Sequence, residues 1–121
     1  YDKGDFVSEL KYNDFKIQKK NIKMKNKKFL NNKSLVIFYA PWCAHCKNIY
    51  DDIRELSISN LNKFKIGAVN ISDNKNKNYL LSEFLDIKSI PSVYIIKNRK
   101  LIKFDKSINF ENIFYYINMN I

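Results

Sequence analysis

The sequence predicts an α/β domain with a central β-sheet and helices packed against it. Two observations support this class. Strand-like and helix-like segments alternate along the chain, and the last three read as two strands of a hairpin followed by an amphipathic helix. The chain has 121 residues, of which 45% are hydrophobic, and only two glycines and two prolines interrupt regular structure. We therefore expect residues 1–121 to form a single domain with one sizeable core.

The first half of the chain contains two expected strands. Residues 6–10 read as a short strand in which Val7 and Leu10 reach inward. Residues 34–39 carry the run Leu-Val-Ile-Phe-Tyr, which is apolar throughout. Such a run is typical of an interior strand that is covered on both faces.

The segment between these strands has the weakest pattern. Ile17, Ile22 and Met24 are apolar, but their spacing fits neither the helical nor the strand period cleanly. We expect a helix within residues 20–30. The lysine-rich stretch at about residues 16–33 is interpreted as an insertion.

A helix is expected over residues 43–59, where Ile49, Ile53 and Leu56 recur at helical spacing. Residues 64–71 read as the next strand. Asp73 and Asn74 offer an N-cap for a helix that extends through residues 79–85.

The C-terminal third ends the predicted sheet. Residues 91–96 read as a strand entered through Pro91, residues 97–100 as a hairpin turn, and residues 101–104 as the returning strand. The closing helix is marked by four apolar residues at helical spacing, which are Phe110, Ile113, Phe114 and Ile117.

The charge is strongly positive and unevenly distributed. The net charge is +10, and no acidic residue lies between Asp14 and Asp51. This interval holds a cluster of lysines, namely Lys19, Lys20, Lys23, Lys25, Lys27, Lys28 and Lys33. One interpretation is a binding face for acidic partners, and the other is a solvated face. The scarcity of arginine favours the solvated face and argues against a nucleic-acid partner.

The chemistry of this chain is concentrated in residues 40–47, which read Ala-Pro-Trp-Cys-Ala-His-Cys-Lys. This stretch holds both cysteines, the only tryptophan and the only histidine. If the helix begins at Cys43, the two sulfurs lie one turn apart on one face. Cys43 would then meet the unpaired N–H groups and the dipole of the helix start, which favour a thiolate. His45, placed between the cysteines, can stabilise that thiolate further.

The cysteines allow two other interpretations. Both could be inert core residues, but the preceding strand and the Pro-Trp pair argue against this. A structural zinc site needs four ligands, and the chain offers only two cysteines and one histidine. We therefore predict no metal and no cofactor. No apolar run approaches the roughly 20 residues of a membrane-spanning helix.

Residues 40–47 resemble the active-site motif of the thioredoxin superfamily, specifically its protein disulfide isomerase branch, which usually has glycine in place of Ala44. Residues 7–10, with Asn13 and Phe15, are similar to the opening strand of that branch. Residues 89–92 resemble its segment with a cis proline facing the cysteines. The resemblance extends over essentially the whole chain and implies a thioredoxin fold, a central mixed β-sheet flanked by α-helices.

The resemblance implies a role for each matched residue. Cys43 would be the attacking thiol, Cys46 the resolving thiol and His45 the residue that tunes them. The peptide bond before Pro91 would be cis, with the backbone of Ile90 free to bind a client strand. Trp42 would offer a contact surface for the client.

Two departures from the family pattern stand out. Ile37 occupies the position at which isomerases usually carry a buried glutamate that relays the proton of the second thiol. Asp51 replaces the usual helix proline, so we expect the customary kink to be missing. The replacement of the glutamate by Ile37 predicts that Cys46 resolves the mixed disulfide slowly. Mixed disulfides with clients should therefore be long-lived.

The expected function is that of a thiol–disulfide oxidoreductase of disulfide isomerase type that acts on the cysteines of protein clients. The alternative is a weakly active thioredoxin-fold binding or adaptor module within a larger secretory-pathway protein. The resemblance favours the endoplasmic reticulum or secretory pathway as the compartment.

Overall fold

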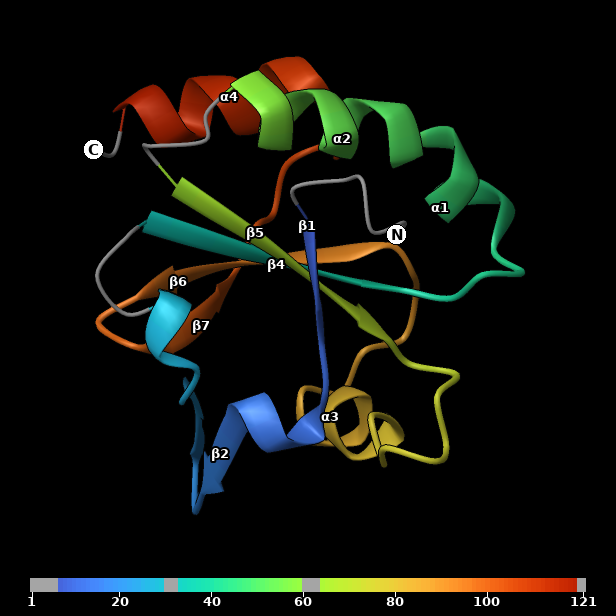
Figure 1. Cartoon of the computed structure of the whole chain (residues 1–121), viewed down its shortest axis with the longest axis vertical. Helices are drawn as coiled ribbons and strands as arrows, with labels where there is room; N and C mark the ends of the chain where they lie inside the picture. The colour runs from blue at the N-terminus through green and yellow to red at the C-terminus, as the bar shows by residue number, and fades with distance from the viewer. Residues whose placement is uncertain (1–6, 30–32, 60–63, 120–121) are drawn as a thin grey trace.

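A computed structural model of the chain describes residues 7–29, 33–59 and 64–119. Within these residues, one seven-stranded sheet has the order β1-β5-β4-β6-β7-β3-β2, and helices lie on both of its faces (Figure 1). The strands are β1 (Val7–Leu10), β2 (Phe15–Gln18), β3 (Asn21–Met24), β4 (Lys33–Tyr39), β5 (Phe64–Asn70), β6 (Ser92–Lys97) and β7 (Lys100–Lys103). The helices are α1 (Ala44–Asn48), α2 (Tyr50–Ser59), α3 (Tyr79–Phe84) and α4 (Phe110–Met119), with 3-10 turns η1 (Tyr12–Asp14) and η2 (Lys27–Phe29). The predicted α/β class is confirmed.

Strand β4 is the interior strand that its apolar run predicted. It pairs in parallel with β5 and antiparallel with β6. Leu35 and Ile37 point to the sheet face covered by α2 and α4, here called the helix face. Val36 and Phe38 point to the opposite face, here called the hairpin face. All four side chains are fully buried.

The helix face is closed by α2 and α4, which lie side by side over the sheet (Figure 1). Ile53 of α2 and Ile113 of α4 are fully buried against it. The carboxylate of Asp52 in α2 accepts a hydrogen bond of 3.2 Å from the backbone N–H of Phe110 at the start of α4. The expected terminal helix is thus confirmed. No helix in the described part of the chain is long and apolar enough to cross a membrane.

The expectation of an α-helix within residues 20–30 is wrong, because this range holds strand β3 and the 3-10 turn η2. Strand β3 pairs with β2 as an antiparallel hairpin. The apolar residues alternate with period two in each strand, Phe15 with Ile17 and Ile22 with Met24. Each strand has only four residues. Two alternating pairs separated by a lysine turn are too short to be recognised as strands from their pattern alone.

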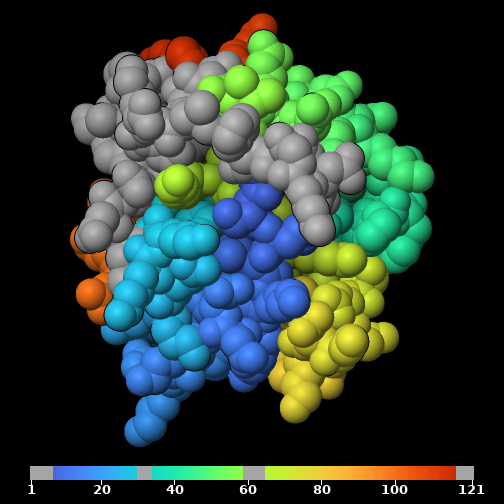
Figure 2. Space-filling view, in the orientation of Figure 1, coloured from blue at the N-terminus to red at the C-terminus, as the bar shows by residue number. Residues whose placement is uncertain are grey.

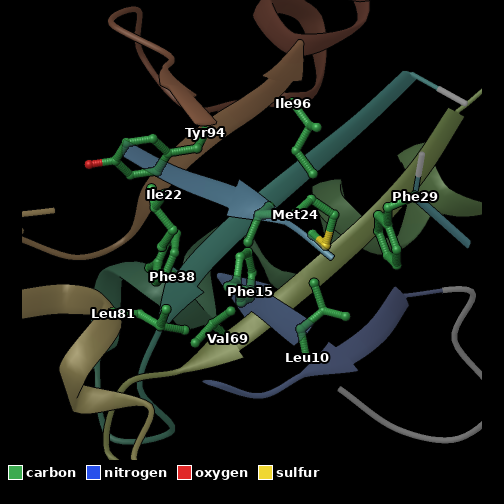
Figure 3. Packing of buried hydrophobic residues seen from close by; sticks show 11 residues of the cluster. Leu10, Phe15, Ile22, Met24, Phe29, Phe38, Val69, Leu81, Tyr94 and Ile96 are labelled. Carbon is green, nitrogen blue, oxygen red and sulfur yellow. The ribbon is translucent and has the colours of Figure 1, made fainter. Parts of the chain in front are cut away.

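This hairpin supplies much of the core of the hairpin face. In Figure 3 its side chains Phe15, Ile22 and Met24 point toward Phe38 of β4 and Val69 of β5. The same cluster includes buried residues from other elements, namely Leu10 of β1, Phe29 of η2, Leu81 of α3, and Tyr94 and Ile96 of β6. Part of the lysine-rich segment therefore belongs to the hydrophobic core. The interpretation of this segment as an insertion stays a prediction.

The two edge strands of the sheet, β1 and β2, are joined by only residues 11–14. Seven flat strands would span about 29 Å at ~4.8 Å per spacing. The chain from Leu10 to Phe15 reaches at most ~19 Å. The sheet must therefore curl, and Leu10 and Phe15 indeed pack in one cluster. In Figure 2 the blue N-terminal segment lies between the cyan residues around η2 and the yellow residues before α3.

The single helix expected over residues 43–59 is interrupted. Helix α1 ends at Asn48, Ile49 adopts φ −96° and ψ −1°, and α2 begins at Tyr50. The expectation of an uninterrupted helix was therefore wrong, and the break forms with Asp51 in place of proline.

The helix expected after an N-cap at Asp73 begins later, at Tyr79. The Asp73 carboxylate instead accepts hydrogen bonds from the backbone and side chain of Asn76, at 3.1 and 2.7 Å. These two bonds lower the pKa of Asp73. Asp73 thus closes a turn, not a helix. The buried side chain of Asn78 accepts a hydrogen bond from the N–H of Tyr12 (2.9 Å) and ties α3 to the end of β1.

The hairpin expected in the C-terminal third is confirmed, but its turn is shorter than the expected residues 97–100, because Lys97 and Lys100 pair as strand residues. Strands β6 and β7 pair as a hairpin. Its turn residues Asn98 and Arg99 have φ of 52° and 69°. Two successive residues with positive φ are typical of tight hairpin turns.

Candidate active site

The cysteine motif lies at the junction of β4 and α1. Ala40, directly after β4, is buried, and its carbonyl accepts a 3.1 Å hydrogen bond from the N–H of Cys43. This turn places Cys43 at the N-cap of α1 with extended backbone angles. The strand, the turn and the helix thus fix the position of the first cysteine.

The two cysteines face each other as free thiols. The backbone N–H of Cys46 donates a hydrogen bond to the Sγ atom of Cys43 at 3.2 Å. Only 7% of Cys43 and 6% of Cys46 is exposed. The expected arrangement, two sulfurs on one face and one turn apart, is therefore present.

The segment before β6 lies against the first cysteine. The peptide bond between Ile90 and Pro91 is cis, which confirms the expectation. The Cys43 thiol lies 3.6 Å from the carbonyl oxygen of Ile90 and donates to it. The hydroxyl of Ser92 donates to the carbonyl of Ser89 at 2.7 Å and closes the turn around Pro91.

Two predicted site residues are exposed to solvent. Trp42 has 71% of its surface exposed, and His45 is also exposed. Neither side chain makes a hydrogen bond within the described residues. The structure thus brings Cys43, Cys46 and Ile90 together and leaves Trp42 and His45 available at the rim.

Cys46 is a thiol with a raised pKa. The pKa of the Cys46 thiol is raised to about 12, chiefly by burial and also by the hydrogen bond and the charge of Cys43. Ile37, at the position of the missing acid, is fully buried in the apolar cluster of the helix face. No titratable side chain stands at that position to take a proton from Cys46.

Comparison with known proteins decides the family. The family model described as thioredoxin matches residues 14–118. The chain belongs to the thioredoxin family. The predicted thioredoxin fold is confirmed by this match together with the mixed sheet and its helices.

Relatives of this thioredoxin-family chain include protein disulfide-isomerases and thioredoxins. It is 35% identical over 71 residues to protein disulfide-isomerase MPD1 of Saccharomyces cerevisiae, covering 59% of this chain and 22% of that protein. It is 36% identical over 75 residues to a thioredoxin of Buchnera aphidicola subsp. Acyrthosiphon pisum, covering 60% of this chain and 66% of the thioredoxin. Bloodstream-specific protein 2 of Trypanosoma brucei brucei is 28% identical over 92 residues, covering 72% of this chain and 17% of that protein. The chain thus spans about a fifth of the length of protein disulfide-isomerase MPD1 and of Bloodstream-specific protein 2.

Reasoning from the sequence missed one residue of this thioredoxin-family site, Ile71. Ile71 packs against the cluster of Ala40, Cys43 and Cys46. Its N–H donates to the carbonyl of Tyr39 at 2.9 Å, which extends the parallel pairing of β5 with β4. The signal that could have found it is its place directly after a buried strand, at the same sheet end as the motif.

The chemistry that these residues can support is thiol chemistry. Among the described residues, no three side chains of His, Cys, Asp or Glu lie close enough together to hold a metal ion. The two sulfurs, the facing carbonyl of Ile90 and the exposed rim therefore make up the site.

Proposed function

We propose that this domain is a thiol–disulfide oxidoreductase of protein disulfide isomerase type that forms, reduces or isomerises disulfides in protein clients. The observation that carries the proposal is the pair of free thiols at the start of α1, with the N–H of Cys46 donated to Cys43 Sγ at 3.2 Å. The N–H of Cys46 can donate a hydrogen bond to a Cys43 thiolate as well as to a thiol, so it can stabilise the nucleophilic form of Cys43.

In the reducing direction, the Cys43 thiolate attacks one sulfur of a client disulfide. A bond forms between Cys43 and that sulfur, the client disulfide breaks, and its second sulfur leaves as a thiolate that takes a proton from water. Cys46, once deprotonated, then attacks the Cys43 sulfur and releases the first client sulfur as a thiolate. Two electrons have passed from the dithiol to the client, and the reverse sequence oxidises a client dithiol.

The other site residues assist these steps. We propose that His45 stabilises the charged sulfur when it faces Cys43 and that exposed Trp42 provides an apolar contact for the client. The Ile90 carbonyl, 3.6 Å from Cys43 Sγ, would accept a backbone hydrogen bond from the client, with Pro91 setting the direction of that segment. A location in the endoplasmic reticulum or secretory pathway is part of the proposal and is supported by the likeness of residues 40–47 to the isomerase motif.

Two observations favour a second candidate, a weakly active binding or adaptor module within a larger protein. The raised pKa of Cys46 and the apolar Ile37 both disfavour rapid resolution of a mixed disulfide. Such a module would still bind unfolded clients but would turn over slowly.

Insulin reduction and refolding of scrambled ribonuclease test the proposal. Wild-type protein should be active in both assays, Cys43→Ser should be inactive, and Cys46→Ser should accumulate mixed disulfides. Because the chain has only two cysteines, any adduct of a single-cysteine variant identifies its sulfur. If wild type binds unfolded clients but has no more activity than Cys43→Ser, the adaptor role is the correct one.

A further inference from the structure

A row of four lysines crosses four neighbouring strands of the sheet. Lys97 of β6 pairs with Lys100 of β7, Lys100 pairs with Lys23 of β3, and Lys23 pairs with Lys16 of β2. Directly paired residues of antiparallel strands project from the same face of a sheet. These four residues are called the lysine row below.

The lysine row projects from the helix face, beyond the part that helices cover. Ile95, two residues before Lys97 in β6, packs into the cluster of the helix face. Ile22 and Leu101, which alternate with the row in β3 and β7, pack into the hairpin face instead. Three of the four lysines are exposed, and Lys23, in the middle of the row, is half-buried.

The positive charges of the row have no partner among the residues that the structure describes. Among the described residues, none of the four ammonium groups forms an ion pair or a side-chain hydrogen bond. Like charges directly opposite each other on neighbouring strands repel. Strands lie ~4.8 Å apart, which is shorter than the Debye length of about 8 Å at physiological salt. A partner with matching negative charge would relieve this repulsion.

We propose that the lysine row is a docking surface for an acidic segment of a polypeptide. The row is a line about 15 Å long, or three strand spacings, and an extended chain covers that length in about five residues. Its neighbours on the same face are the neutral side chains of Gln18, Asn21 and Ile102. Ile102 is 46% exposed and offers an apolar contact to a residue that flanks the acidic segment.

The same features disfavour the other polyanions. A single-stranded nucleic acid needs aromatic side chains on which its bases stack, and this face of β7, β3 and β2 carries none. The row contains no arginine for bidentate phosphate contacts, since Arg99 lies in the adjacent turn. An anionic bilayer favours a broad basic patch, whereas this row is one residue wide.

The lysine row and the thiols occupy opposite ends of the sheet. Ile96, next to Lys97, pairs with Ser34 near the start of β4, whereas Cys43 follows the end of β4. Docking at the row therefore does not depend on the proposed redox activity.

Fluorescence anisotropy of the full chain with a labelled oligo-glutamate peptide tests the inference. One variant replaces Lys16, Lys23, Lys97 and Lys100 by glutamine. The matched control replaces four exposed lysines outside the row, namely Lys65, Lys75, Lys103 and Lys106. We expect the row variant to bind about tenfold more weakly than wild type and the control to change less than about twofold. The Cys43→Ser variant should bind like wild type, even if the redox proposal fails.

Two results would overturn the inference. Equal weakening in the row variant and its control would mean that only net charge matters. Binding of a single-stranded oligonucleotide or of phosphatidylserine vesicles as tightly as the peptide would contradict the acidic-polypeptide partner. Should the fourfold variant not fold, Lys100→Gln and Lys103→Gln provide the same comparison on opposite faces of β7. Only Lys100→Gln should weaken binding, and equal effects would overturn the inference.

Discussion

The Sγ atom of Cys43 lies 3.6 Å from the carbonyl oxygen of Ile90, although 47 residues separate the two in the chain. The thiol donates to this oxygen, while the N–H of Cys46 donates to the sulfur. Loss of the thiol proton removes the first bond and keeps the second. In the proposed mechanism, the Ile90 carbonyl thus becomes free to accept a client N–H at the step in which Cys43 becomes a nucleophile.

This relationship predicts that a client backbone N–H contributes to the reaction. A disulfide peptide that is N-methylated at the residue paired with Ile90 should form the mixed disulfide about fivefold more slowly, because one hydrogen bond of ~1 kcal/mol is lost. The measurement is the rate constant of adduct formation with Cys46→Ser, for a set of peptides methylated at successive positions. Rates that are the same for every methylated position would contradict the role of Ile90.

The raised pKa of Cys46 predicts a strong pH dependence of its reactivity. Burial disfavours the thiolate, so its fraction is small at neutral pH and grows about tenfold per pH unit toward the pKa of about 12. Alkylation of Cys46 in the Cys43→Ser variant, where the burial remains, should therefore accelerate well above pH 9. A peptide thiol is the control, and its alkylation rate should level off near pH 9. A plateau for Cys46 in the same range would show that burial does not govern this thiol.

Ile37 predicts a slow resolving step that a carboxylate can rescue. In Ile37→Glu we expect mixed disulfides to be released about tenfold faster or more, because a base at that position can take the Cys46 proton. The same variant should lose about 3 kcal/mol of unfolding free energy, since a fully buried apolar residue is replaced by a carboxyl group. Stopped-flow decay of the adduct measures the rate.

Ile37→Gln is the matched control for that experiment. It has nearly the same shape as glutamate and a similar cost in stability, but it cannot accept the proton. If Ile37→Glu releases the mixed disulfide no faster than wild type or Ile37→Gln, the missing carboxylate is not the cause of the slow resolving step.

The burial of Phe29 predicts that the lysine-rich segment stabilises the fold. Phe29 is 1% exposed in the cluster of the hairpin face, so Phe29→Ala should lower the free energy of unfolding by about 3–5 kcal/mol. Its exposed neighbour offers the comparison, because Lys28→Ala should change stability by no more than ~0.5 kcal/mol. Urea denaturation of both variants is the measurement, and similar small losses would mean that this segment is dispensable.

Long apolar runs made much of the fold predictable. The interior position of β4, the hairpin of β6 and β7 and the amphipathic α4 all follow from patterns of six residues or more. The hairpin of β2 and β3 was missed because each strand offers only two inward residues, such as Ile22 and Met24. The late start of α3 was missed because Asp73 caps a turn as readily as a helix.

The site was predictable where its residues are adjacent in the chain. Cys43, Cys46 and Pro91 were found through compact motifs, and the structure places Ile90 against Cys43 as expected. Ile71 was missed because its contact with the cysteines depends on the register of β5 against β4. That register is set by the packing of two buried strands and leaves no local mark in the sequence.

The edge strands of the curled sheet also limit how this domain can pair with extended chains. Within the described residues, the edge strands β1 and β2 are each four residues long and have a neighbour on one side only. Each edge strand has one charged residue at an exposed position, Glu9 in β1 and Lys16 in β2. Short, charged edges resist the addition of strands from other molecules. A domain proposed to handle unfolded clients can therefore hold them at the Ile90 carbonyl without joining them into a growing, aggregating sheet.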